Sequence, residues 1–168
     1  MIRILSATAV ALLLGAAALI PITVMPASAG PGAPGHSHDH SGFSAGEPGN
    51  PNKSARIVLV TMREADGKML FIPDRIEVRK GEQIRFTIRN NGLLDHEFVL
   101  ASIEDNNKHA ELMKKYPDME HDDPNGKSLA PNKTGDIVWR FTKAGEFEFA
   151  CLIPGHREAG MHGTIVVK

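Results

Sequence analysis

The sequence is poor in cysteine, in aromatic residues and in clustered positive charge. Of its 168 residues only one is cysteine, Cys151, and only 5% are aromatic. A single cysteine excludes an internal disulfide framework. The 19 Lys and Arg residues are spread along the chain among 20 Asp and Glu residues, which argues against a nucleic-acid partner. In an oxidising compartment a lone thiol serves as an intermolecular bridge, a reactive group or a metal ligand.

Residues 1–29 have the pattern of a secretory signal peptide. Arg3 precedes an apolar run over 4–20, and Ala27-Ser28-Ala29 forms an A-x-A motif, so we expect cleavage after Ala29. The alternative is an uncleaved membrane anchor, because the apolar run is almost long enough to span a bilayer. We favour cleavage, which predicts a periplasmic protein that is free of the membrane.

Residues 30–54 are rich in Gly, Pro and Ser and contain few large apolar side chains. Such a segment buries too little surface to offset its ordering entropy, so we expect a flexible arm. The arm carries His36, His38 and His40 at alternate positions. It is either a solvated tail without function or a group of imidazoles that captures metal.

From residue 55 to 168 the composition is that of one folded domain. In "EQIRFTIRN", Ile84, Phe86 and Ile88 alternate with polar residues, as in a half-buried strand. About seven or eight such short segments, separated by turn residues, predict an all-β antiparallel sandwich or barrel. One helix is expected over residues 107–116, where Pro117 ends it.

The closing stretch "FACLIPGHREAGMHGTIVVK" holds the candidate chemistry. Cys151 ends a strand, His156 follows a Pro-Gly turn, and Met161 precedes the last strand. Thiolate, imidazole and thioether ligands on one loop favour copper, and a trigonal His₂Cys site with a weak axial Met is an electron-transfer copper centre. That site needs a second histidine. His96, at the start of a strand 55 residues before Cys151, is the best candidate; its rivals are His109, His121 and His162.

The spacing Cys151-x4-His156-x4-Met161, followed by "GTIVV" and preceded by a lone histidine about 55 residues earlier, resembles the type 1 copper cupredoxin family. The ligand loop is more similar to those of azurin, rusticyanin and auracyanin than to that of plastocyanin. This resemblance implies a Greek-key β-sandwich over residues 56–168 with one copper held by His96, Cys151, His156 and Met161. Many cupredoxins have Asn directly after the first histidine; this chain has Glu97 there.

More narrowly, "KHAELMKKYPDMEHDDPN" and the histidine arm are similar to periplasmic cupredoxins of bacterial copper tolerance. This resemblance implies that the protein binds or oxidises periplasmic copper. The alternative is a soluble carrier that shuttles one electron between redox proteins. We do not expect an enzyme, with oxidation of Cu(I) as the one activity left open. The expected partners are copper ions and a periplasmic redox or copper-transport protein, and we expect a monomer.

Further His and Met side chains are candidates for a second copper site. His109 and Met113 are four residues apart on the predicted helix and therefore share a face. Met119 and His121 follow in the next loop. The alternative for Met113 is ordinary packing beneath the helix. Together with the arm, the candidates for secondary copper are His36, His38, His40, His109, Met113, Met119 and His121.

Overall fold

The computed structural model describes residues 42–116 and 123–168. The predicted signal peptide, the arm histidines, Met119 and His121 lie outside these ranges. Among the described residues, no helix is both long and apolar enough to cross a membrane.

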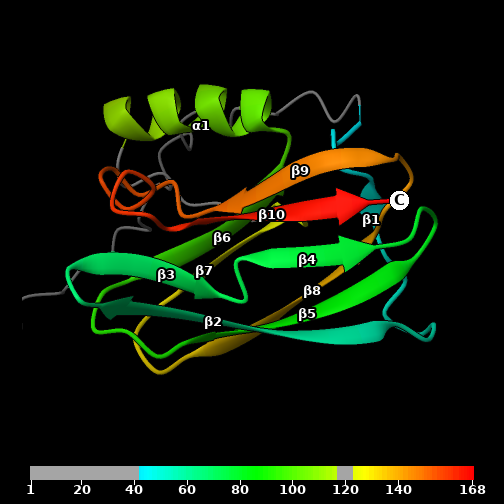
Figure 1. The fold of residues 1–168 in the computed structure, drawn as a ribbon, viewed down its shortest axis with the longest axis horizontal. Helices are drawn as coiled ribbons and strands as arrows, with labels where there is room; N and C mark the ends of the chain where they lie inside the picture. Colours follow the sequence, from blue (N-terminus) through cyan, green and yellow to red (C-terminus); the bar gives the residue numbers. More distant parts are fainter. Residues whose placement is uncertain (1–41, 117–122) are drawn as a thin grey trace, which may run out of the picture. The chain divides into compact units, whose positions relative to one another are not determined.

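Two five-stranded sheets pack face to face, with one helix outside them (Figure 1). The order in the first sheet is β1 (Glu47–Pro48), β8 (Thr134–Arg140), β5 (Gln83–Asn90), β2 (Arg56–Ala65) and β3 (Lys68–Ile72). The order in the second sheet is β4 (Arg75–Val78), β10 (His162–Val167), β9 (Gly145–Ala150), β6 (His96–Ala101) and β7 (Gly126–Leu129). The predicted all-β sandwich with one inserted helix is confirmed.

Most strand pairs are antiparallel, as expected, but β2 pairs with β5 and β4 with β10 in parallel. Both parallel pairs arise because the chain changes sheets. It leaves the first sheet after β3, forms β4 on the edge of the second sheet, and returns to place β5 beside β2. The end of β2 and the start of β6 come into contact at one end of the sandwich, where the site described below is found.

The core lies between the sheets and is built from alternating side chains. Ile84, Phe86 and Ile88 of β5 are fully buried, which confirms the alternation seen in the sequence. The Phe149 ring stacks on Phe98 with ring centroids 5.1 Å apart. Each such apolar side chain contributes about 1.5–3 kcal/mol when it is fully buried. The same core cluster contains Cys151 and Met161, so the core continues to the candidate ligands.

The start of the folded domain lies earlier than composition indicated. Residues 47–48 pair with β8, and Ala45 is fully buried. Trp139 donates a hydrogen bond from Nε1 to the Ala45 carbonyl at 3.3 Å, and Phe43 packs edge-on against its ring. The folded domain therefore begins before residue 55, the boundary predicted from composition. Two apolar residues, Phe43 and Ala45, attach the Gly- and Pro-rich segment to the sheet.

The helix α1 (Ile103–Lys115) connects β6 to β7 and packs on β6 and β9. It begins four residues before the predicted start, since the Ser102 side chain caps it by accepting a hydrogen bond from the Asp105 backbone N–H at 3.1 Å. Met113 is buried beneath it in a small apolar cluster with Val99, Ala150 and Leu152. Met113 thus packs beneath the helix, as the alternative for this residue predicted.

Candidate metal centre

The four candidate ligands lie at one end of the sandwich, and three strands of the second sheet position them. His96 is the first residue of β6, Cys151 directly follows β9, and Met161 directly precedes β10. β9 pairs with both of the other strands, so it brings His96 beside the loop that follows Cys151. We call residues 151–161 the ligand loop; His156 lies at its centre.

The donor atoms of three of these residues converge. His96 Nδ1 lies 3.2 Å from His156 Nδ1, and Cys151 Sγ lies 3.4 Å from the same nitrogen. All three atoms lie within 4.8 Å of one another. Among the described residues this is the one group of three or more His, Cys, Asp or Glu side chains with that geometry.

Main-chain hydrogen bonds within the ligand loop hold the fourth candidate, Met161, next to the other ligands. The Cys151 N–H donates to the Met161 carbonyl and the Met161 N–H donates to the His156 carbonyl, each at 3.0 Å. Gly155 and Gly160 have positive φ angles of 89° and 106°, which glycine adopts without strain and which allow the tight turn. The Met161 side chain is fully buried. These hydrogen bonds and glycine conformations therefore define the shape of the loop.

Burial shifts the pKa values of Cys151 and His156. It raises the pKa of the Cys151 thiol to about 12, although backbone N–H groups, including that of Glu97, oppose the shift. Burial also lowers the pKa of His156, and the neighbouring His96 lowers it further. His96 is fully buried whereas His156 is half-buried, so of the two imidazoles His156 is the one that solvent reaches.

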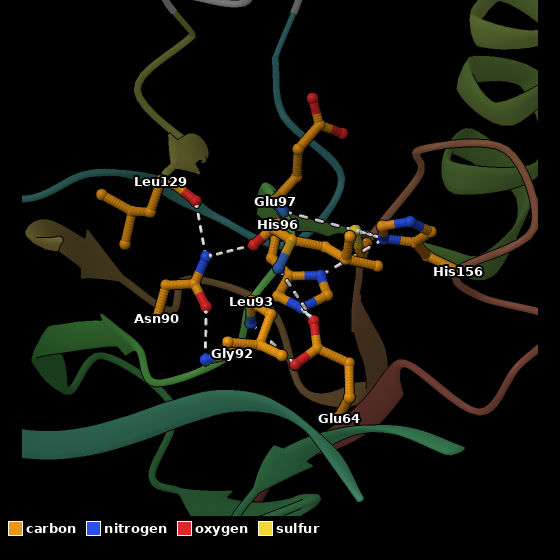
Figure 2. A network of polar contacts seen from close by, with 10 residues as sticks. Glu64, Asn90, Gly92, Leu93, His96, Glu97, Leu129 and His156 are labelled. Atoms are coloured by element: carbon orange, nitrogen blue, oxygen red, sulfur yellow. Dashed lines mark hydrogen bonds and ion pairs between the residues drawn. The ribbon is translucent and has the colours of Figure 1, made fainter. Parts of the chain in front are cut away.

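Glu97, which stands where many cupredoxins have Asn, contributes through its backbone. Its N–H donates to Cys151 Sγ at 3.3 Å. Its side chain is buried and accepts a hydrogen bond from the Ser128 hydroxyl at 3.2 Å. Figure 2 shows this side chain directed away from the His96 and His156 rings. The carboxylate that contacts a candidate ligand comes from Glu64 instead, whose Oε1 lies 2.9 Å from His96 Nε2.

A buried asparagine shapes the segment that leads into His96. Asn90 donates from Nδ2 to the carbonyls of Leu94 and Leu129, both at 2.8 Å, and accepts from the Gly92 N–H at 2.8 Å (Figure 2). It therefore joins the turn over residues 90–94 to β7. This network fixes the point at which β6 begins, and with it the place of His96.

An ion pair ties the ligand loop to the second sheet and to α1. Arg157 Nη2 lies 2.8 Å from each carboxylate oxygen of Glu148 in β9, and Arg157 Nη1 donates to Asn107 Oδ1 at 2.6 Å. Asn106 of the helix donates to Oε2 of the same carboxylate at 2.9 Å. The inserted helix thus holds the residue that follows His156.

The structure brings together only part of the set that the sequence singled out. His96, Cys151 and His156 converge, and Met161 is joined to them through the backbone. His109 lies half-buried on α1 and His162 is exposed on β10. The prediction of a second copper site falls mostly on residues outside the described part of the chain: His36, His38, His40, Met119 and His121. Sequence reasoning missed Glu64 and Arg157, because each is an ordinary charged residue until the fold places it beside the site.

The donor set fits a copper ion. Metal–nitrogen and metal–thiolate bonds of about 2.0 and 2.3 Å place the donors of one ion roughly 3 to 4 Å apart. Two of the three observed separations are 3.2 and 3.4 Å, and all three are within 4.8 Å. Two imidazoles, one thiol and a buried thioether match the donor preferences of copper. A two-sheet β-sandwich with these donors converging at one end defines the class of copper-binding cupredoxins.

Comparison with known proteins agrees. The chain belongs to the plastocyanin/azurin family of copper-binding proteins, whose family model matches residues 58–168. It is similar to the copper-resistant cuproprotein CopI of Rubrivivax gelatinosus, at 48% identity over 79% of this chain and 78% of that protein. It also resembles CopI of Pseudomonas aeruginosa, at 33% identity over 90% and 95% of the two chains. Among solved structures, the reduced auracyanin of Roseiflexus castenholzii has a TM-score of 0.55 at 20% identity, over 68% of this chain and 98% of that one.

Proposed function

We propose that His96, Cys151, His156 and Met161 hold a single type 1 copper and that the protein acts in copper tolerance. The convergence of two imidazole nitrogens and the only thiol carries the first part of this proposal. The second part is supported by the similarity to the CopI relatives, which are named copper-resistant cuproproteins. This similarity covers most of the length of both chains. A bound copper supplies one-electron chemistry, between Cu(I) and Cu(II).

Each of the four proposed ligands has a distinct task in that proposal. Cys151 supplies the thiolate, and the Glu97 N–H, 3.3 Å away, stabilises its negative charge. The two imidazoles offer their Nδ1 atoms, which lie 3.2 Å apart, and the fully buried Met161 offers a thioether. Because the loop and β6 are both held by hydrogen bonds, the ligands need to move little when the oxidation state changes.

The site assignment is tested by loading the purified protein with Cu(II). We expect an intense visible charge-transfer band from the thiolate, one copper per site, and loss of the band in Cys151→Ala. Met161→Leu should keep the band and shift its position, because the axial ligand tunes the centre. A colourless wild-type complex would refute the type 1 assignment.

Copper tolerance is tested in cells. Deleting the gene should lower the copper concentration at which growth stops, and the wild-type gene should restore it whereas Cys151→Ala should not. Fractionation of the wild-type cells locates the protein. A chain that begins after Ala29 and is found in the periplasmic extract would support the predicted signal peptide. A full-length chain in the membrane fraction would favour the uncleaved anchor.

Electron transfer between redox proteins is the second candidate. The segment before His96 favours it, because Leu93 is 88% exposed and Leu94 is 46% exposed, which gives a partner protein an apolar surface near the ligands. In this case the deletion strain tolerates copper normally and shows a respiratory defect.

The arm histidines and the His/Met residues around 109–121 are proposed to bind additional copper in support of tolerance. Copper stoichiometry decides this, measured on the chain that starts at residue 30 and on one that starts at residue 42. Two or more coppers on the longer chain, and fewer on the shorter one, would assign binding to the arm.

A further inference from the structure

A carboxylate from the first sheet reaches across the sandwich to the fully buried ligand of the second. Glu64 lies near the end of β2, and its Oε1 is 2.9 Å from His96 Nε2. Figure 2 shows the carboxylate pointing at the His96 ring, with His156 on a different side of that ring. The two ring nitrogens of His96 are therefore used separately: Nε2 faces Glu64 and Nδ1 faces His156 and the metal site.

The carboxylate is held in place by the segment that precedes His96. The Leu93 N–H donates to Glu64 Oε2 at 2.9 Å, and the Leu94 N–H donates to Oε1 at 3.1 Å. These two backbone donors, one to each oxygen, direct the carboxylate at the His96 ring.

Gly92 leaves the space that this arrangement requires. A Cβ at position 92 would lie 2.5 and 2.8 Å from the two oxygens of Glu64. Real Cβ atoms do not approach that closely, so any larger residue would displace the carboxylate. The fold therefore provides the acceptor, two donors that orient it and a gap that admits it.

We propose that Glu64 is a positioning residue of the copper centre: it accepts the Nε2–H hydrogen bond of His96, presents His96 Nδ1 to the metal, and lowers the reduction potential of the bound copper. The proposal rests on the role of His96 as a ligand in the proposed function. The hydrogen bond made by one imidazole nitrogen sets which nitrogen binds the metal. A charged acceptor makes a stronger bond than a neutral one and increases the electron density that the ring donates. That density stabilises Cu(II) more than Cu(I).

The test uses Glu64→Gln, which keeps the size of the side chain and removes its charge. We expect the reduction potential to rise and Cu(II) affinity to fall about tenfold or more, the range found when such outer partners are lost, with a smaller change for Cu(I). Voltammetry of the copper-loaded protein and competition with chelators specific for each oxidation state measure these quantities.

Glu82→Gln is a matched control. Its carboxylate is paired with Arg56 at the opposite end of β2, and its side chain is 24% exposed against 26% for Glu64. This variant should leave the potential and both affinities unchanged.

Gly92→Ala is a second test, because it pushes the Glu64 carboxylate away from His96 without changing any charge. It should shift the potential in the same direction as Glu64→Gln.

A measurement without metal separates this proposal from the proposed function. Nitrogen NMR of the metal-free wild-type protein should show His96 protonated at Nε2, and Glu64→Gln should weaken that preference. If the potential of Glu64→Gln equals that of the wild type, or if His96 carries its proton on Nδ1, the role of Glu64 is refuted. If Cys151→Ala keeps the wild-type copper spectrum, the type 1 assignment fails instead, whatever the NMR shows.

Discussion

Replacing Arg157 with glutamine is expected to destabilise the metal-free protein by about 2–3 kcal/mol, because it leaves the Glu148 carboxylate buried without its cation. Both oxygens of Glu148 lie 2.8 Å from Arg157 Nη2. Removing one partner of a fully buried pair costs about 3–5 kcal/mol. The Arg157 side chain is 23% exposed, so solvent screens the pair and the lower figure follows. For a domain of about this size the melting temperature should fall by roughly 8–12 °C.

Thermal unfolding followed by circular dichroism, on metal-free protein, measures this loss. Arg140→Gln is the control, because Arg140 makes a similar pair with Glu47 at 3.0 Å but both side chains are more than half exposed. It should cost less than about 1 kcal/mol. The double variant Arg157→Gln/Glu148→Gln should be more stable than Arg157→Gln alone, since no buried charge is then left unpaired. If Arg157→Gln melts within a degree of the wild type, the pair does not anchor the ligand loop.

Three other outcomes follow from the structure and need only melting curves. A chain that starts at residue 55 should be about 3 kcal/mol less stable than one that starts at residue 42, since it lacks Phe43 and exposes Trp139; equal stability would restore the boundary predicted from composition. Gly163→Ala should cost about 2 kcal/mol or more, because its Cβ would collide with the Phe149 ring and lie 2.7 Å from the Asp74 carbonyl oxygen; an unchanged melting temperature would contradict this packing. Free Cu(II) at a hundred times its dissociation constant should stabilise the wild type by about 2.7 kcal/mol but leave Cys151→Ala almost unchanged; equal stabilisation would place the copper elsewhere.

The fold and the donor set could be predicted from sequence because their signals are local. The alternation of Ile84, Phe86 and Ile88 follows the two-residue period of a strand, and the spacing of Cys151, His156 and Met161 fits one loop. The second histidine could be chosen only as the best of several candidates, since strand pairing, not sequence distance, brings His96 to the loop. Glu97 drew attention through its position next to His96, yet it is Glu64, 32 residues away, that contacts the ring.

The contacts that hold the site could not be predicted, for a common physical reason. Glu64 and Arg157 each act through a partner in another element: Glu64 bridges from β2 to β6, and Arg157 joins the ligand loop to β9 and α1. A charged residue in a polar stretch gives no sign that the fold will bury its partner. The attachment of Phe43 and Ala45 was hidden in the same way, because a segment's average composition conceals two well-placed apolar side chains.

The balance between burial and charge connects the site to the proposed function. Burial of His96, Cys151 and Met161 disfavours the extra positive charge of Cu(II) and so raises the reduction potential. The Glu64 anion behind His96 acts in the opposite direction, and it is placed on the ligand that solvent does not reach. A lower potential makes Cu(I) at this site a better electron donor to an oxidised redox protein, and it retains the Cu(II) that is formed. A protein of copper tolerance can use that combination better than a carrier that must return to the reduced state easily, so the proposed role of Glu64 agrees with the proposed function rather than with the second candidate.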